Sequence, residues 1–316
     1  MQKIILVLVM CLTLLNANKK EKIIIAGPFT NVSHPILHMI ETGVLKDLAK
    51  KVEFKYWKNQ DQLRAMILSN EVDFMAVPVN AAAILYNKGI DLQLLNVSIW
   101  GNYGIVSSKN IKNFKDLKGI SLAVPSRGDM PDIIIQKLIK ANGMKKNDIK
   151  IAYMPTPIDG LSMVVKGKVD AAFLPEPALS MAILKSKKRL KVVLNIQDEY
   201  KKAFNTTKTF PQVGFAVMGK NKHNSKFINR FVTEYKKSMQ WYQTHPKQAS
   251  KIVVKYLPML KQKAVAMGVK NIEIKTQTAQ EAKQEIKQWF KNLKQFNSKL
   301  IGGKQPNNNF YYKCEK

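Results

Sequence analysis

Polar side chains recur at four points of the sequence, each where an apolar stretch ends and a helix-like stretch begins. These points are residues 29–34, Asn80, residues 126–129 and Glu176, which stands between two prolines. Hydroxyl and amide groups can hold a small polar solute, and Arg127 could add a bidentate contact to a carboxylate, sulfonate or phosphate. The sequence therefore predicts a binding site for a small polar or anionic ligand.

The residues that we expect to contact this ligand are Thr30, Asn31, Ser33, His34, Asn80, Trp100, Tyr103, Ser126, Arg127, Asp129 and Glu176. Several of them have a second, structural interpretation that the sequence leaves open. Asn80 and Ser126 are also suited to capping helices, and Arg127 could pair with Asp129 or with Asp132. Glu176 could bridge two parts of the protein. Trp100 and Tyr103 could either stack on a flat ligand or pack at a hinge.

Signatures of catalysis are weak. The sequence contains no GxSxG, HExxH or P-loop motif, and no GxGxxG motif after a strand. His34 is the one candidate base near the acidic residues of the predicted site. His34 and His38 stand four residues apart, but an obvious third metal ligand is missing. We therefore expect a binding protein with no catalytic residues, no metal and no cofactor.

The elements that position these residues form an internal repeat with an offset of 97 residues. The segment VDFMAVPVNAAAIL at 72–85 has a counterpart, VDAAFLPEPALSMAIL, at 169–184. Both begin with Val-Asp, continue as an apolar strand, reach a proline and enter an alanine-rich helix. The match continues into the residues that precede each segment, so that one β-α-β-α-β unit occurs twice in the sequence. Two similar lobes are predicted, with the ligand in the cleft between them.

Strands that alternate with helices indicate parallel sheets with right-handed crossovers. The expected strands are 22–26, 52–57 and 73–77 in the first unit and 120–124, 149–154 and 169–174 in the second. Ligands of such sheets lie at the carboxyl ends of the strands, where helix N-termini favour an anion. Asp73 and Asp170 precede their strands at the opposite end, and we expect them to be turn residues.

The lobes are predicted to be connected twice, by the extended stretches 92–108 and 211–218. The first lobe is assigned residues 18–103 plus 217–316, and the second is assigned 104–216. Helical stripes of apolar residues after 218 are expected to pack against the first lobe. The polar tail over 302–316 is expected to be loosely held.

Residues 1–17 have the pattern of a signal peptide, with Lys3, an apolar run over 4–15 and a small residue at Ala17. The run is too short to span a bilayer. Cys11 follows Met10, where a lipobox has a small residue, so no lipid anchor is expected. Removal of the leader would leave Cys314 alone, and no intrachain disulfide could form. The mature protein is therefore expected to be periplasmic, without stable membrane insertion.

The chain is strongly basic, with 52 Lys and Arg against 22 Asp and Glu and a net charge of +30. Such a charge raises nucleic acid and anionic membranes as partners. However, no block of five like charges occurs, which indicates lysines spread over solvated helix faces. We expect no nucleic-acid partner.

Three stretches resemble a known family, and the resemblance covers about residues 22–218. They are FKDLKGISLAVPSRGD at 114–129, KANGM at 140–144 and VKGKVDAAFLPEPALSMA at 165–182. They are similar to the substrate-binding proteins of nitrate, sulfonate and taurine ABC importers, a group that includes binders of thiamine-precursor pyrimidines. The resemblance implies an α/β, type II periplasmic-binding fold, with two lobes, two crossing strands and a ligand between the lobes.

The resemblance also implies that the four polar points face the ligand. Residues 30–34 depart from the usual pattern of the group, which leaves the identity of the solute open. We expect a monomeric periplasmic receptor that delivers a sulfonate, nitrate, taurine or pyrimidine-type solute to an ABC permease with its ATPase. The alternatives are an enzyme on the same fold, of menaquinone- or pyrimidine-pathway type, and a basic exported protein that binds polyanions.

Overall fold

The structure, a computed structural model, describes residues 19–313. The predicted signal peptide over 1–17, the anchor considered at Cys11, and Cys314 lie outside the described residues. No helix within 19–313 combines the length and apolar composition that a membrane crossing requires.

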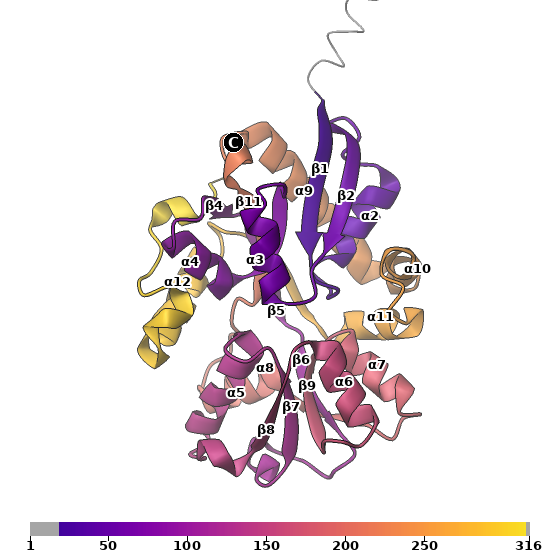
Figure 1. The fold of residues 1–316 in the computed structure, drawn as a ribbon, viewed down its shortest axis with the longest axis vertical. Coiled ribbons are helices and arrows are strands. Elements are labelled where there is room, and N and C mark those ends of the chain that lie inside the picture. The colour runs from indigo at the N-terminus through magenta and orange to yellow at the C-terminus, as the bar shows by residue number, and fades with distance from the viewer. Residues whose placement is uncertain (1–18, 314–316) are drawn as a thin grey trace, which may run out of the picture.

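The described chain forms two β-sheets, each flanked by helices, which lie one above the other in Figure 1. The seven-stranded sheet has the order β12-β5-β11-β3-β1-β2, with β4 paired to β11. Its strands are β1 (Lys20–Gly27), β2 (Ala49–Tyr56), β3 (Phe74–Pro78), β4 (Leu92–Leu94), β5 (Asn96–Gly101), β11 (Val213–Met218) and β12 (Glu273–Thr278). We call this sheet with its helices the first lobe. Those helices are α2 (His34–Thr42), α3 (Gln60–Leu68), α4 (Val79–Asn87), α9 (Ser225–Thr244) and α10 (Pro246–Tyr256).

The five-stranded sheet has the order β10-β6-β9-β7-β8 and forms the second lobe. Its strands are β6 (Tyr103–Ser107), β7 (Ser121–Pro125), β8 (Lys150–Met154), β9 (Ala171–Pro175) and β10 (Lys191–Asn195). Its helices are α5 (Met130–Ala141), α6 (Pro157–Val165), α7 (Ala178–Lys185) and α8 (Ile196–Ala203). Two further helices, α11 (Gln262–Gly268) and α12 (Lys283–Phe296), contact both lobes.

The strand register confirms the internal repeat. Ile25 of β1 pairs with Phe74 of β3, and the residues 97 positions later, Leu122 and Ala171, pair in the same way in the second lobe. The pairings of β1 with β2 and of β7 with β8 are also parallel and related by the same offset. Each lobe therefore contains the same parallel unit, whose carboxyl ends face the other lobe (Figure 1).

Asp73 and Asp170 have a larger role than the predicted turn residues. Asp73 Oδ2 accepts a hydrogen bond from the Ile24 amide at 2.7 Å, and Asp170 Oδ2 accepts one from the Ser121 amide at 3.0 Å. The two acceptor–donor pairs are related by the repeat offset. Each carboxylate therefore ties the start of one strand to its parallel neighbour, β3 to β1 and β9 to β7.

The chain crosses between the sheets twice, close to the expected positions. The first crossing runs from β5 to β6 through Asn102, and the second lies between α8 and β11. The stretch 211–218 is mostly not a crossing, because β11 already pairs antiparallel with β3 over Val213–Val217. The second sheet begins at Tyr103 with β6, and the chain returns to the first sheet at Val213 with β11.

Residues 303–313 are not loosely held, and the prediction for this part of the tail was wrong. Phe310, Tyr311 and Tyr312 are buried in the first lobe. The Tyr312 amide donates to the Leu94 carbonyl at 2.9 Å, and Tyr311 forms a parallel bridge with Leu94. Burial of three aromatic side chains outweighs the polar composition of this segment.

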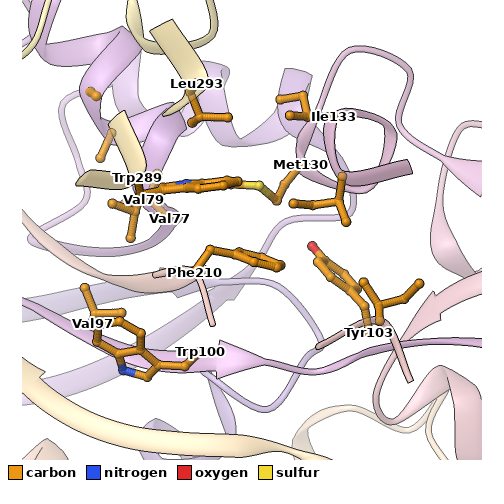
Figure 2. Packing of buried hydrophobic residues seen from close by; sticks show 14 of the residues in the cluster. Val77, Val79, Val97, Trp100, Tyr103, Met130, Ile133, Phe210, Trp289 and Leu293 are labelled. Carbon is orange, nitrogen blue, oxygen red and sulfur yellow. The ribbon is translucent and has the colours of Figure 1, made fainter. Parts of the chain in front are cut away.

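A hydrophobic cluster joins the two lobes on one side, and Figure 2 shows its centre. Phe210, in the second crossing, stacks on Trp289 of α12 with ring centroids 5.0 Å apart, and both contact Tyr200 of α8. The same cluster contains Val97 of the first lobe and Met130 of the second. On another side of the interface, α11 packs against both α10 and α7. The structure therefore shows the lobes in contact.

Candidate functional site

A cavity of about 90 Å³ lies between the lobes, at the carboxyl ends of their parallel strands. By the same measure one water needs about 10–15 Å³, so the cavity has room for a small molecule. Both lobes and both crossings contribute to it. Its lining residues are Pro28, Phe29, Thr30, Trp57, Lys58, Asn59, Gln60, Pro78, Asn102, Tyr103, Pro125, Ser126, Asp129, Met130, Pro131, Pro157, Pro175, Gln212 and Val213.

Four of the eleven residues predicted from the sequence line this cavity: Thr30, Tyr103, Ser126 and Asp129. Thr30 follows β1, and Ser126 and Asp129 follow β7, as the rule for parallel sheets predicts. Tyr103 begins β6 directly after the first crossing. The ends of the two repeat units and one crossing therefore bring these four side chains together.

The remaining residues of the first polar point lie beneath the cavity wall. The His34 ring contacts the Phe29 carbonyl through Nε2 and the Tyr242 hydroxyl through Nδ1, both at 2.9 Å. Asn31 Nδ2 donates to the same hydroxyl at 2.6 Å, and Ser33 is fully buried. Burial lowers the pKa of His34 to about 4, although its contact with the Phe29 carbonyl opposes the shift. These residues shape the loop that carries Phe29 and Thr30.

Arg127 and Trp100 contact other residues and are not among the residues that line the cavity. The Arg127 side chain is exposed, and its guanidinium lies over the Tyr153 ring, 5.1 Å from the centroid. It makes no ion pair with Asp129 or Asp132, which was the structural alternative. Trp100 Nε1 donates to the Lys275 carbonyl at 2.7 Å, which ties β5 to β12. The role of these two residues as ligand contacts remains a prediction, because neither of them lines the cavity.

Glu176 is buried and bridges the lobes. Its carboxylate accepts hydrogen bonds from the Ser180 amide and hydroxyl, each at 3.1 Å, and from Asn271 Nδ2 at 2.7 Å. Asn271 follows α11, whereas Glu176 belongs to the second lobe. Burial raises the pKa of Glu176, and the three hydrogen bonds oppose that shift. Asn80 lines a neighbouring hollow between α3, α4 and the 128–130 segment.

Sequence reasoning missed several lining residues, chiefly Trp57, Asn102 and Gln212. Trp57 directly follows β2, so the rule that selected the other strand ends could have found it. Four of the lining prolines could also have been found from the internal repeat. Pro28 and Pro125 occupy equivalent positions in the two repeat units, and so do Pro78 and Pro175. Gln212 had no such signal, since its position depends on the path of the second crossing.

Two buried polar atoms of the lining have no hydrogen-bond partner within residues 19–313. They are Trp57 Nε1, a donor, and Gln212 Oε1, an acceptor. Trp57 is 7% exposed and Gln212 is 1% exposed. Gln212 Nε2 donates to Asn102 Oδ1 at 2.6 Å. Unpaired polar groups at this depth are unusual and require an explanation.

The charged residues of the lining are Lys58 and Asp129. Asp129 is the N-cap residue of α5, yet its side chain makes no capping hydrogen bond. Burial raises the pKa of Asp129 to about 6, with Arg64 opposing the shift and Asp61 and Asp132 adding to it. Burial also raises the pKa of Tyr103, while the adjacent Gln212 amide opposes that shift. The cavity is thus mainly apolar, with one half-buried carboxyl group.

No three His, Cys, Asp or Glu side chains within 19–313 form a group that could hold a metal ion. His34 and His38, the two histidines that stand four residues apart, contact other side chains. His34 binds Tyr242, and His38 Nδ1 contacts the Ser238 hydroxyl at 3.0 Å while its ring stacks on Trp241. These contacts account for both rings without a ligand.

Comparison with solved structures identifies the fold. An ABC transporter protein from Parabacteroides distasonis is similar with a TM-score of 0.77 and 22% identity, over 94% of this chain and 100% of that chain. The aliphatic sulphonate binding protein SsuA from Escherichia coli gives 0.71 and 17% over 94% of each chain. The nitrate-binding protein NrtA from Synechocystis PCC 6803 gives 0.65 and 15%, over 83% and 74%. These similarities confirm the predicted periplasmic-binding-protein architecture.

The family assignment rests on a separate comparison. No curated protein sequence gave a match. Residues 47–249 match the family model described as NMT1/THI5 like, which is more than half of the chain. The predicted relationship to ABC substrate-binding proteins is therefore confirmed, and the chain belongs to the NMT1/THI5-like family.

Proposed function

We propose that this protein is the solute receptor of an ABC importer, which captures a small molecule between its lobes and presents it to a permease with its ATPase. The observation that carries this proposal is the cavity, because equivalent loops of both lobes line it. The similar structures include ABC-type binding proteins for sulfonate and nitrate, which supports the same function here. A periplasmic location is part of the proposal and depends on the signal pattern of residues 1–17.

Capture would work through a shift between open and closed arrangements. A solute that touches both lobes favours the closed arrangement by its additional contacts there. The measured affinity is then reduced by the free energy needed to close the lobes. The aromatic cluster around Trp289 and the α11–α7 contact would lower that free energy, because both join the lobes.

An enzymatic function has less support. The described lining residues include one carboxylate and one lysine, and they contain neither histidine nor cysteine. His34, the candidate base, is buried beneath the wall with both ring nitrogens in contact with partners. General acid–base chemistry would depend on Asp129 and Tyr103, and the Thr30 and Ser126 hydroxyls of the lining have no histidine among the lining residues to activate them as nucleophiles.

A thermal-shift screen of residues 18–316 tests the receptor function. The panel would contain taurine, ethanesulfonate, nitrate, substituted pyrimidines and short carboxylates. A solute present at 100 times its dissociation constant should stabilise the protein by about 2.7 kcal/mol. A shift that Trp57→Phe weakens would support the proposal. A flat screen together with salt-sensitive retention on heparin would favour the polyanion alternative instead.

A further inference from the structure

We propose that helices α10 and α11 form a docking face for an anionic lipid bilayer, through which the protein rests on the membrane surface without inserting a helix. The proposal goes beyond the receptor function and does not depend on which solute the cavity holds. It is carried by the unpaired charge of the two helices, by the hollow that they line and by one exposed apolar side chain at their junction.

The segment that forms the two helices carries positive charge alone. Residues 246–272 contain six lysines and no Asp, Glu or Arg. All six are exposed: Lys247, Lys251, Lys255, Lys261, Lys263 and Lys270. Lys255 pairs with Glu41 of α2 at 2.8 Å, and the other five make no ion pair with any residue of 19–313. The segment therefore presents a surplus of positive charge.

The elements packed against α10 and α11 do not neutralise this charge. α2 contributes Glu41, the partner of Lys255, and α7 contains no carboxylate. In α9, Glu234 is buried and pairs with Arg230 and Lys237. Counterions for the exposed lysines must therefore come from the solvent or from a partner.

Four of the lysines gather on one face, which we call the lysine face. Lys247, Lys251 and Lys255 are spaced four residues apart, so they form one row along α10. Like charges at this spacing destabilise a helix unless they are neutralised. Beside the row, Lys263 of α11 joins Lys247 and Lys251 in lining a hollow of about 630 Å³ that contains no carboxylate. The two helices pack side by side at the edge of the molecule (Figure 1).

The chemistry of the lysine face fits a layer of lipid headgroups. Lysine is a compact charge without a planar, bidentate geometry, so it suits a diffuse layer of phosphates better than one oriented ligand. Met259 is 42% exposed in the turn between α10 and α11. An apolar side chain with lysines on both sides can enter the headgroup region while the lysines contact the phosphates. An anionic bilayer satisfies both features with one surface.

Flotation with lipid vesicles tests the proposal. Residues 18–316 would be mixed with vesicles of phosphatidylcholine that contain about 30% phosphatidylglycerol, and with vesicles of phosphatidylcholine alone. We expect binding to the anionic vesicles only, and its loss as salt rises from about 0.05 M to about 0.5 M, because salt screens the charges. The triple variant Lys247→Gln, Lys251→Gln and Lys263→Gln should bind about 100-fold more weakly, since each lysine contributes about a factor of five. Met259→Ser should weaken binding about fivefold without changing its salt dependence.

The matched control is the triple variant Lys287→Gln, Lys291→Gln and Lys294→Gln. It removes the same charge from exposed lysines of α12, on the other side of the molecule in Figure 1. This control should weaken binding by less than about threefold, because charges away from the contact are screened. Circular dichroism would establish that both variants are folded.

Equal weakening by the two triple variants would overturn the proposal, because net charge alone would then explain the binding. Equal binding to neutral vesicles, or no binding to either kind, would also overturn it. Binding to poly-glutamate without binding to the anionic vesicles would reject the bilayer and assign the lysine face to an acidic protein partner. None of these outcomes bears on solute capture in the cavity, so the receptor function is tested separately.

Discussion

The substitution Asp129→Asn is expected to stabilise the folded protein at neutral pH. The Asp129 side chain caps nothing, so asparagine loses no structural hydrogen bond. In the folded protein the carboxylate is half-buried beside the cavity, with Asp61 and Asp132 adding repulsion and Arg64 adding attraction. Asparagine has nearly the same shape and no charge to desolvate.

The size of the expected stabilisation follows from the pKa of Asp129, which burial raises from 3.8 to about 6. The folded state therefore holds the proton more tightly than the unfolded state between these two values. Stability falls as pH rises through that window, because the unfolded state ionises first. The loss is at most about 3 kcal/mol, from roughly two pKa units at about 1.4 kcal/mol each. Partial exposure of the side chain makes the smaller values within this limit more realistic.

The assay is urea unfolding of the wild type and of Asp129→Asn at pH 4 and at pH 7.5. The difference in unfolding free energy should be near zero at pH 4 and should reach about 1–3 kcal/mol in favour of the variant at pH 7.5. Comparing the two proteins at each pH cancels the titration of other groups. Asp47→Asn is the control and should change stability by less than about 0.5 kcal/mol at both pH values. Equal stability of the variant and the wild type at pH 7.5 would refute the reasoning.

Two further substitutions and one deletion test the packing of the protein. Gly214→Ala should destabilise the protein by about 3 kcal/mol or more in urea unfolding, because its Cβ would lie 1.8 Å from the Asn96 carbonyl oxygen. Asn271→Ala should cost about 1–3 kcal/mol at pH 8, since it removes a partner of the buried Glu176 carboxylate. That cost should shrink in unfolding experiments at lower pH, where the raised pKa of Glu176 allows protonation. Deletion of 308–316 should lower the melting temperature strongly because it removes the buried Phe310–Tyr312 segment, and an unchanged melting temperature would contradict the assigned packing.

The two-lobed fold could be predicted because its physical causes are local in the sequence. Apolar strands, the prolines at their ends and the alanine-rich helices repeat at one offset, so the parallel unit and its polar ends were visible twice. The same logic placed Thr30, Ser126 and Asp129 at the strand ends. These positions follow from the geometry of any parallel sheet and need no knowledge of distant contacts.

The remainder of the site depends on partners that are far away in the sequence. Histidine is a residue type that often occurs in functional sites. The His34 ring is nevertheless held inside the lobe by its buried partner, Tyr242 of α9. Arg127 lies over Tyr153, which belongs to the neighbouring strand. Gln212 reaches the cavity because of the path of the second crossing. No local pattern records such contacts, so the position of Arg127 over Tyr153 and the presence of Gln212 in the cavity lining could not be predicted from the sequence.

The capture of a small solute in the cavity is most directly tested by native mass spectrometry. Residues 18–316 would be equilibrated with the small-molecule extract of the producing cells, beside Thr30→Phe, which introduces an aromatic ring at the cavity wall. Circular dichroism would establish that the variant is folded. We predict that the wild type retains one solute in a one-to-one complex and that the variant does not. Absence of any retained solute, or equal retention by the two proteins, would contradict the proposed function of the cavity.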